Sequence, residues 1–289
     1  MKLPRKLKDD IDVNQNLKML TQAYQEHAIE QINFARYSVI SSREFAEELE
    51  EIFFNVKTSY KSFLEAMKKK NKHLLQANKK DKEVIVLVTS NNKFYGDIIA
   101  KLWHAFYVRM KKTDLTKTDM VVVGRQGRNF IEQSDLPKDY RYLEIPDTNF
   151  TLETLKPLIA IILPYERVTV FYGKFNNIIS QEPIEASLAG DFPEDRKTTE
   201  EKKSFLFEPS IEHILTFFET QIFSLLFDQT MHEARLARFA SRIKAMEIAQ
   251  TNLQDQLKKL MQRERKFRSI ESNRKQQQMF AGRALWGQR

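Results

Sequence analysis

The stretch from Leu236 to Phe267, LARFASRIKAMEIAQTNLQDQLKKLMQRERKF, decides the fold of this chain. Apolar side chains recur in it at seven-residue intervals and form two columns. One column is unbroken and consists of Phe239, Met246, Leu253, Leu260 and Phe267. The other is interrupted by polar residues and consists of Leu236, Ile243, Gln250, Leu257, Glu264 and Glu271. Two such columns are typical of a coiled coil, whereas a helix packed on a globular core shows a broader apolar stripe.

Both ends of the chain lack helix-breaking residues. After Pro4 the first glycine is Gly96, and after Pro209 neither residue type occurs until Gly282. This spacing predicts a very long C-terminal helix over about 210–281 and a long helix near the N-terminus. The N-terminal stretch has a helical apolar pattern as well, which comprises Leu7, Ile11, Leu17, Leu20, Tyr24 and Ala28. The simplest architecture pairs the two terminal helices in antiparallel orientation.

The middle of the chain has a different pattern, in which short β-rich runs alternate with helical ones. Strands are predicted at Val84–Val88, Met120–Val123, Val168–Tyr172 and Ile178–Ile184, and helices at Asp97–Met110 and Leu152–Ile162. This alternation is typical of a mostly parallel α/β domain. The polar segment Asp191–Lys203 is expected to be a loop or a flexible hairpin.

Composition limits the classes of function. The 289-residue chain has a formal net charge of +8 and no cysteine, which excludes disulfides and cysteine-ligated metal sites. Its first residues lack the apolar core of a signal peptide, and no run approaches the length of a membrane span. Residues 258–289 contain ten Lys or Arg and two Glu, which is the whole excess of positive charge. This basic tail is either a solvated helix face or a surface for an anionic partner, such as nucleic acid, a membrane surface or an acidic protein.

No motif in the sequence argues for catalysis. The segment Val123–Arg128, VGRQGR, follows a predicted strand but lacks the spacing of a dinucleotide fingerprint and the ending of a P-loop, so we expect a plain strand-to-helix turn. No histidine has another histidine at a metal-ligand spacing, and no serine lies in a nucleophile elbow. We therefore expect no catalytic residue, no cofactor and no metal.

Six local motifs, in the same order, resemble those of the gamma subunit of rotary F-type ATPases. Ile11 with Leu20–Tyr24 resembles that family's RI…ITxAM stretch, and Val86–Ser90 resembles the strand before its SDRGLCGG segment. The remaining motifs are Val123–Arg128 for VGRKGR, Val170–Phe175 with Ser180–Pro183 for VYNxFxS…QxP, Phe207–Ser210 for FEPS, and Arg242–Asn252 for RMxAMxxATDNA. A gapless continuation of the last motif places Arg268 on the arginine of the family's YNxxRQ.

The resemblance covers nearly the whole chain and implies its fold. The fold class is α/β, a long antiparallel coiled coil of the N- and C-terminal helices with an inserted Rossmann-like α/β domain. The expected boundaries are 1–80 for the N-terminal coiled-coil region, 81–208 for the α/β domain and 209–289 for the C-terminal helix.

The resemblance also implies a function, that of a central rotor shaft inside a ring of three alpha-type and three beta-type subunits. The catalytic sites would belong to those partners, an epsilon-like subunit and a membrane rotor ring would dock at the foot, and nucleic acid would not be a partner. The complex would lie in the cytoplasm, at the inner face of the cell membrane. The residues expected to contact the partners are Leu20, Thr21, Tyr24, Arg242, Met246, Ala249, Asn252, Lys266 and Arg268. For Met246 the seam of the coiled coil is the stronger interpretation.

Three departures from the family pattern leave alternatives open. Asn91–Gly96 replaces the glycine-rich segment, Glu264-Arg265 and Ser269 differ from the YNxxRQ motif, and Met279–Arg289 is more basic than usual. One alternative is a gamma-like shaft in a dedicated motor that drives another machine, such as surface gliding. The other is a coiled-coil scaffold with a small-molecule-binding or nucleic-acid-binding α/β domain.

Overall fold

A computed structural model describes residues 4–59, 80–188 and 211–286 of the chain. The structure divides into two compact units, one formed by residues 1–28 with 242–289 and the other by residues 29–241. Two long helices contribute to both units, α1 (Arg5–Ser59) and α6 (Ile211–Trp286). In the described part of the chain, no helix combines the length and the apolar character that a membrane span requires.

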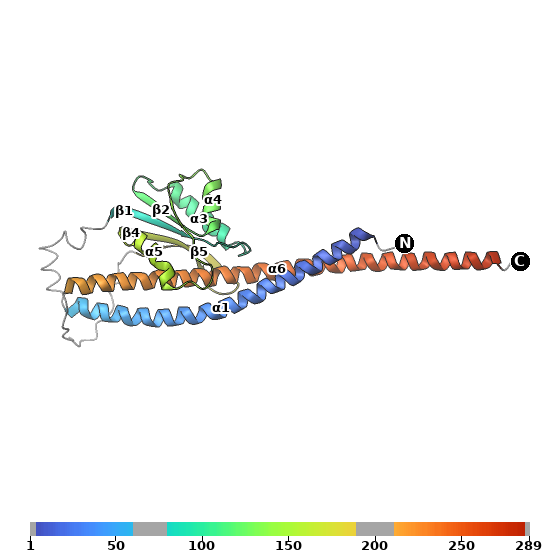
Figure 1. Ribbon diagram of the computed structural model, residues 1–289, viewed down its shortest axis with the longest axis horizontal. Helices are drawn as coiled ribbons and strands as arrows, with labels where there is room; N and C mark the ends of the chain where they lie inside the picture. Colours follow the sequence, from blue (N-terminus) through green and yellow to red (C-terminus); the bar gives the residue numbers. More distant parts are fainter. Residues whose placement is uncertain (1–3, 60–79, 189–210, 287–289) are drawn as a thin grey trace. The chain divides into compact units, whose positions relative to one another are not determined.

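The unit of residues 29–241 contains a five-stranded sheet with the strand order β3-β2-β1-β4-β5 (Figure 1). The strands are β1 (Lys80–Val88), β2 (Thr118–Val123), β3 (Arg141–Leu143), β4 (Tyr165–Phe175) and β5 (Gln181–Ser187). The first four strands run parallel and only β5 is antiparallel, to β4. The central strand β1 is buried on both faces, as its apolar run VIVLV requires.

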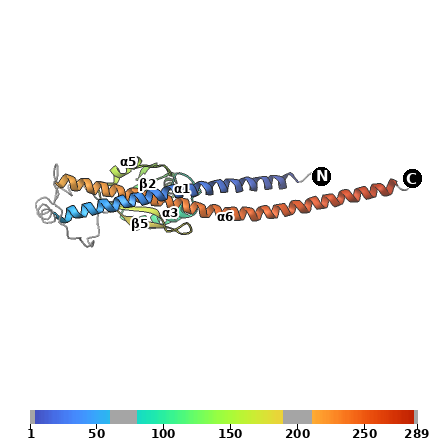
Figure 2. The same ribbon diagram turned by 90° about the horizontal axis from the view of Figure 1, so that it is seen from below.

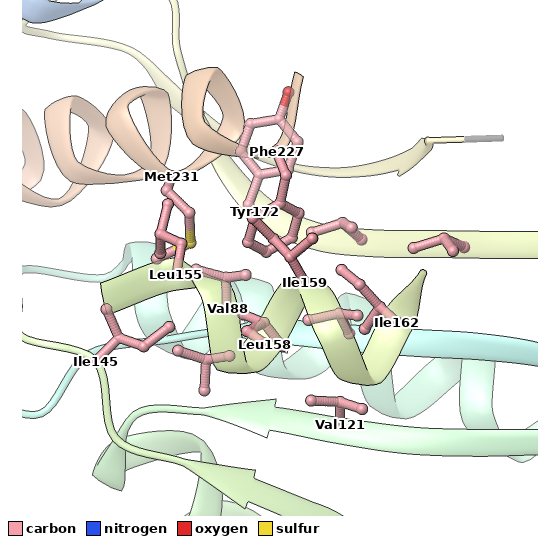
Figure 3. Packing of buried hydrophobic residues seen from close by; sticks show 14 of the residues in the cluster. Val88, Val121, Ile145, Leu155, Leu158, Ile159, Ile162, Tyr172, Phe227 and Met231 are labelled. Atoms are coloured by element: carbon pink, nitrogen blue, oxygen red, sulfur yellow. The ribbon is translucent and has the colours of Figure 1, made fainter. Parts of the chain in front are cut away.

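Helices cover both faces of this sheet. On one face, α3 (Ile98–Lys111) and α4 (Arg125–Gln133) enclose a core that includes Ile85, Phe106 and Phe171. On the other face, α5 (Leu152–Ile162) packs beside α6. Figure 3 shows Phe227 and Met231 of α6 against Leu155 and Ile159 of α5. Within this unit, α6 therefore supplies a layer of the α/β domain.

These elements confirm the predicted fold class. The helix Leu152–Ile162 has the predicted bounds, and the others differ by a few residues. Strand β3 was not predicted, because its three residues form no apolar run. The predicted fourth strand begins at Gln181 and not at Ile178, because Asn176–Ser180 form the turn of the β4–β5 hairpin. The expected loop at Asp191–Lys203 lies outside the described residues.

In the unit of residues 1–28 and 242–289, α1 and α6 run antiparallel and side by side (Figure 2). Every residue of the two predicted columns from Ile243 to Glu271 is buried or half-buried, which confirms the seam of α6. In α1 the shielded residues other than Tyr24 also follow a seven-residue repeat, and they are Leu7, Ile11, Asn14, Lys18, Thr21, Gln25 and Ala28. Leu17 and Leu20 are instead 43% and 52% exposed, because they lie one position away from this repeat.

Candidate functional site

The carboxyl ends of β1 and β2 form the edge of the sheet at which a ligand would be expected to bind. Open α/β sheets bind ligands outside the carboxyl ends of their strands, at the point where the strand order reverses, which is beside β1 here. In this structure the chain itself covers that edge. The guanidinium Nη1 of the buried Arg238 donates a hydrogen bond to the carbonyl oxygen of Thr89, at 3.1 Å, just beyond the end of β1.

The N-terminus of α4 lies at the same edge, and its N–H groups have protein acceptors. The Arg125 N–H donates to Asn91 Oδ1, the Gln126 N–H to the Ser90 carbonyl and the Gly127 N–H to Thr89 Oγ1. A phosphate at a helix N-terminus needs these same donors. The local geometry also leaves little room, because a Cβ at Gly124 (φ +93°) would lie 2.9 Å from the Ser90 backbone. The arrangement is that of a closed turn, as expected for VGRQGR.

The described residues contain no group of three or more His, Asp or Glu side chains placed to hold a metal ion. Several buried charged groups lie instead on α6. Arg235 is 1% exposed, donates to Gln31 Oε1 at 2.7 Å and lies over the rings of Phe34 and Phe150. Burial and the neighbouring Arg238 lower the pKa of Arg235.

His232 lies one turn before Arg235 on the same buried face. Its ring centre is 4.7 Å from that of Phe150, and its Nε2 is 3.6 Å from Asp228 Oδ2. Burial lowers the pKa of His232 below its ordinary value. The Asp228 carboxylate opposes this shift in part, and the Arg235 guanidinium adds to it. The imidazole is therefore held neutral at neutral pH, where it packs against the Phe150 ring.

The residues expected to contact partners fall into two groups. Five are shielded within the helix pair: Thr21, Tyr24, Arg242, Met246 and Ala249. Arg242 and Met246 are only 4% and 7% exposed. The Arg242 guanidinium lies over the Tyr24 ring, at 5.5 Å from its centre. The structure therefore brings Arg242 and Tyr24 together inside the pair, where they contact each other.

The other four are exposed: Leu20, Asn252, Lys266 and Arg268. The Arg268 side chain is 71% exposed, and its Nη2 forms an ion pair with Glu264, one turn earlier on α6. Because Glu264 is a seam residue with a side chain only 21% exposed, it orients Arg268 from the shielded side. The outer nitrogens of Arg268 stay accessible to a second carboxylate.

Sequence reasoning named Leu20 as a partner contact but missed the exposed apolar surface of α1 to which it belongs. Val13 and Leu17 are 54% and 43% exposed and lie with Leu20 at helical spacing, so the three share one face. On α6, Ile248 is 55% exposed beside the seam residue Met246. The signal was present in the sequence, because these apolar residues stand outside the seven-residue repeat. We call Val13, Leu17, Leu20 and Ile248 the outer apolar residues.

The basic tail forms a second exposed surface. The lysines and arginines between residues 258 and 281 are exposed, and they are Lys258, Lys259, Arg263, Arg265, Lys266, Arg268, Arg274 and Lys275. Together with the outer apolar residues, they give this helix pair a shielded seam and an outer surface suited to an apolar or anionic partner. The shape and chemistry are those of an interaction element.

Comparisons with known proteins assign this architecture to a family. The family model described as ATP synthase matches residues 4–271. The ATP synthase gamma chain of Halothermothrix orenii is 25% identical over 269 residues, which cover 90% of this chain and 91% of the relative. The ATP synthase gamma chain of Clostridium perfringens is 23% identical, with 85% and 84% covered. A chain of the central stalk and c-ring of mitochondrial ATP synthase from Tetrahymena thermophila superposes with a TM-score of 0.57 at 16% identity, with 80% of this chain and 99% of that chain covered.

The structural likeness supports the fold, and the family model supports the assignment. That model spans most of the chain, including both terminal helices and the α/β domain between them. The chain therefore belongs to this ATP synthase family, that of the gamma chains.

Proposed function

We propose that this chain is the central shaft of a rotary ATPase and that it turns inside a ring of alpha-type and beta-type subunits, three of each. The observation that carries the proposal is the match to the ATP synthase family from residue 4 to residue 271, which includes the helix pair. The comparisons favour neither a surface-gliding motor nor a small-molecule-binding scaffold.

The mechanism follows from the asymmetry of a two-helix shaft. Three equal catalytic sites adopt different conformations only if the shaft makes different contacts with each of them, and the difference in contact energy is the coupling. The outer apolar residues and the basic tail suit these contacts, since both surfaces lie outside the seam and are exposed. Among the residues expected from sequence, we assign partner contacts to Leu20, Asn252, Lys266 and Arg268, because they are exposed. We assign Arg242 and Met246 to the contact between the two helices, because they are buried.

The catalytic sites then belong to the partners, and this chain hydrolyses no ATP by itself. The N-terminal N–H groups of α4 support this statement, because they are bonded to residues 89–91. The complex would lie at the inner face of the cell membrane. The membrane rotor ring would bind this chain at its foot, as the c-ring named with the Tetrahymena thermophila central stalk suggests.

Reconstitution tests the proposal. The purified chain, the alpha-type and beta-type subunits of the same organism, and the mixture of all three are assayed for ATP hydrolysis and for assembly by size-exclusion chromatography. We expect no turnover from the chain alone, and its co-elution with the other two in an active complex. Turnover by the chain alone, or an active ring that excludes it, would refute the proposal.

A further inference from the structure

Asp147, in the loop between β3 and α5, is a buried carboxylate that receives four hydrogen bonds. Its Oδ1 accepts from the Asn91 N–H at 2.9 Å. Its Oδ2 accepts from the Asn92 N–H and the Asn92 side-chain amide, both at 2.9 Å, and from the Tyr95 hydroxyl at 3.3 Å. Asp147 is 6% exposed, and within the described ranges it forms no ion pair with Lys or Arg. Its hydrogen-bond partners are therefore four neutral donors from one loop.

This arrangement is that of an anion site. Successive backbone N–H groups that converge on one point form a concavity that binds anions, and here a side-chain amide and a hydroxyl complete it. We propose that the loop Asn91–Tyr95 is an anion cradle filled by the protein's own Asp147, and that it binds a small free carboxylate once that side chain is removed. The site takes formate or acetate, because these reproduce the planar two-oxygen group that the donors face.

The filled cradle has a structural consequence within the unit of residues 29–241. Tyr95 is 2% exposed, and its ring meets the edge of Phe239 of α6 at 5.5 Å and 81°. The next residue, Gly96 (φ +62°), approaches α6 so closely that a Cβ there would lie 2.4 Å from Ser241 Oγ. Asp147 therefore fixes the loop that fastens the α/β domain to α6.

The sequence of the loop agrees with this role. Asn91–Gly96 stands where the gamma family has its glycine-rich segment, and its asparagine side chains add polar groups that glycine lacks. The Asn92 side-chain amide donates to Asp147, while the Asn91 amide donates to the carbonyl of Ile145 at 2.7 Å. The inference concerns the folded chain alone and holds whether or not the chain serves as a shaft.

Chemical rescue of the full-length chain tests the cradle. Asp147→Ala leaves the donors unpaired, and we expect its melting temperature to fall by about 5–10 °C. Sodium formate should restore part of that loss relative to sodium chloride at equal ionic strength. Asp147→Asn should also have a lower melting temperature, because the hydrogens of its amide group would face the donors of the loop. Formate should not raise that temperature, since the asparagine side chain fills the cradle. The exposed Asp139→Ala should melt like wild type and show no response to formate.

Hydrogen exchange of the Asn91 and Asn92 amides gives a second readout. Both should be protected in wild type, exchange faster in Asp147→Ala and regain protection in formate. If Asp147→Ala cannot be purified as folded protein, the same variants are refolded in sodium formate and in sodium chloride, and the two refolding yields are compared. The proposal is wrong if Asp147→Ala melts like wild type, or if formate affects all four proteins equally.

Discussion

Arg242 and Tyr24 contact each other across the two antiparallel helices, with the guanidinium carbon 5.5 Å from the centre of the aromatic ring. Arg242 is 4% exposed, so its guanidinium is shielded from water, which strengthens this cation–π contact. Beside it, the Gln25 side-chain amide donates to Glu247 Oε2 at 2.8 Å, and Gln250 Nε2 donates to Gln25 Oε1. Polar pairs of this kind fix the register of two helices.

A double-mutant cycle should therefore detect coupling between Tyr24 and Arg242. Tyr24→Leu, Arg242→Met and the double variant are compared with wild type by denaturant unfolding of the isolated chain. We expect the two residues to stabilise each other by about 0.5–2 kcal/mol. Additive effects would show that Arg242 does not stabilise the helix pair through Tyr24.

Met246→Asp tests the seam. Met246 is 7% exposed, so an aspartate at this position buries an unpaired charge and should lower the free energy of unfolding by several kcal/mol. Ile248→Asp is the matched control, because Ile248 is two residues away on α6 and 55% exposed. Ile248→Asp should change the free energy of unfolding by no more than about 0.5 kcal/mol from the wild-type value. Equal unfolding of the two variants would place Met246 outside the seam.

Arg268→Ala tests a partner contact. Because the Arg268 side chain is 71% exposed, its loss should leave the melting temperature of the isolated chain nearly unchanged. If it binds a carboxylate of a catalytic partner, assembly or ATPase activity of the complex should fall by the equivalent of about 2–5 kcal/mol. Arg268→Lys should recover part of the loss, since lysine keeps the charge but loses the planar fork.

Two further variants sharpen this test. Arg274→Ala removes another exposed arginine of the same helix. If the position of Arg268 matters and not only its charge, Arg274→Ala should lower assembly and ATPase activity of the complex less than Arg268→Ala does. Glu264→Gln removes the group that orients Arg268 and should weaken the contact with the complex, but less than Arg268→Ala does. Wild-type assembly and turnover in Arg268→Ala would mean that this arginine is a solvated charge.

The stability of the chain should depend on His232 in mildly acidic solution. Burial lowers the pKa of His232 in the folded state below the ordinary value of 6.5. The unfolded state therefore binds the extra proton first, and the free energy of unfolding should decrease as the pH falls below about 6.5. His232→Gln should reduce the slope of melting temperature against pH between about pH 7.5 and about 5.5. An unchanged slope in His232→Gln would show that His232 is not the group that makes the stability depend on pH.

The sequence predicted the helix pair and the parallel sheet because both have strong periodic signals. The seven-residue columns from Ile243 to Glu271 match the shielded residues of α6, and the apolar runs mark β1, β2 and β4. Strand β3 escaped prediction because it is short and polar and is stabilised by its pairing with β2. Polar residues at seam positions of α1, such as Asn14 and Lys18, hid which face of that helix is shielded.

The site was harder to predict than the fold. An arginine beside a seam can project outward, as Arg268 does, or lie inward over an aromatic ring, as Arg242 does. Sequence spacing does not separate these cases, since the outcome depends on the facing residue of α1. The role of Asp147 was also hidden, because its donors lie more than fifty positions earlier in the chain.

Rotation of the chain inside its complex is the central claim, and labelling tests it directly. The chain has no cysteine, so His104→Cys, at an exposed position on α3, gives a single attachment point for a gold particle. The alpha-type and beta-type subunits are fixed to a surface, ATP is added, and the particle is followed by dark-field microscopy. We predict stepwise rotation in one direction that stops when ATP is withdrawn. A particle that stays still or only fluctuates, in complexes that hydrolyse ATP at the full rate, would contradict the account.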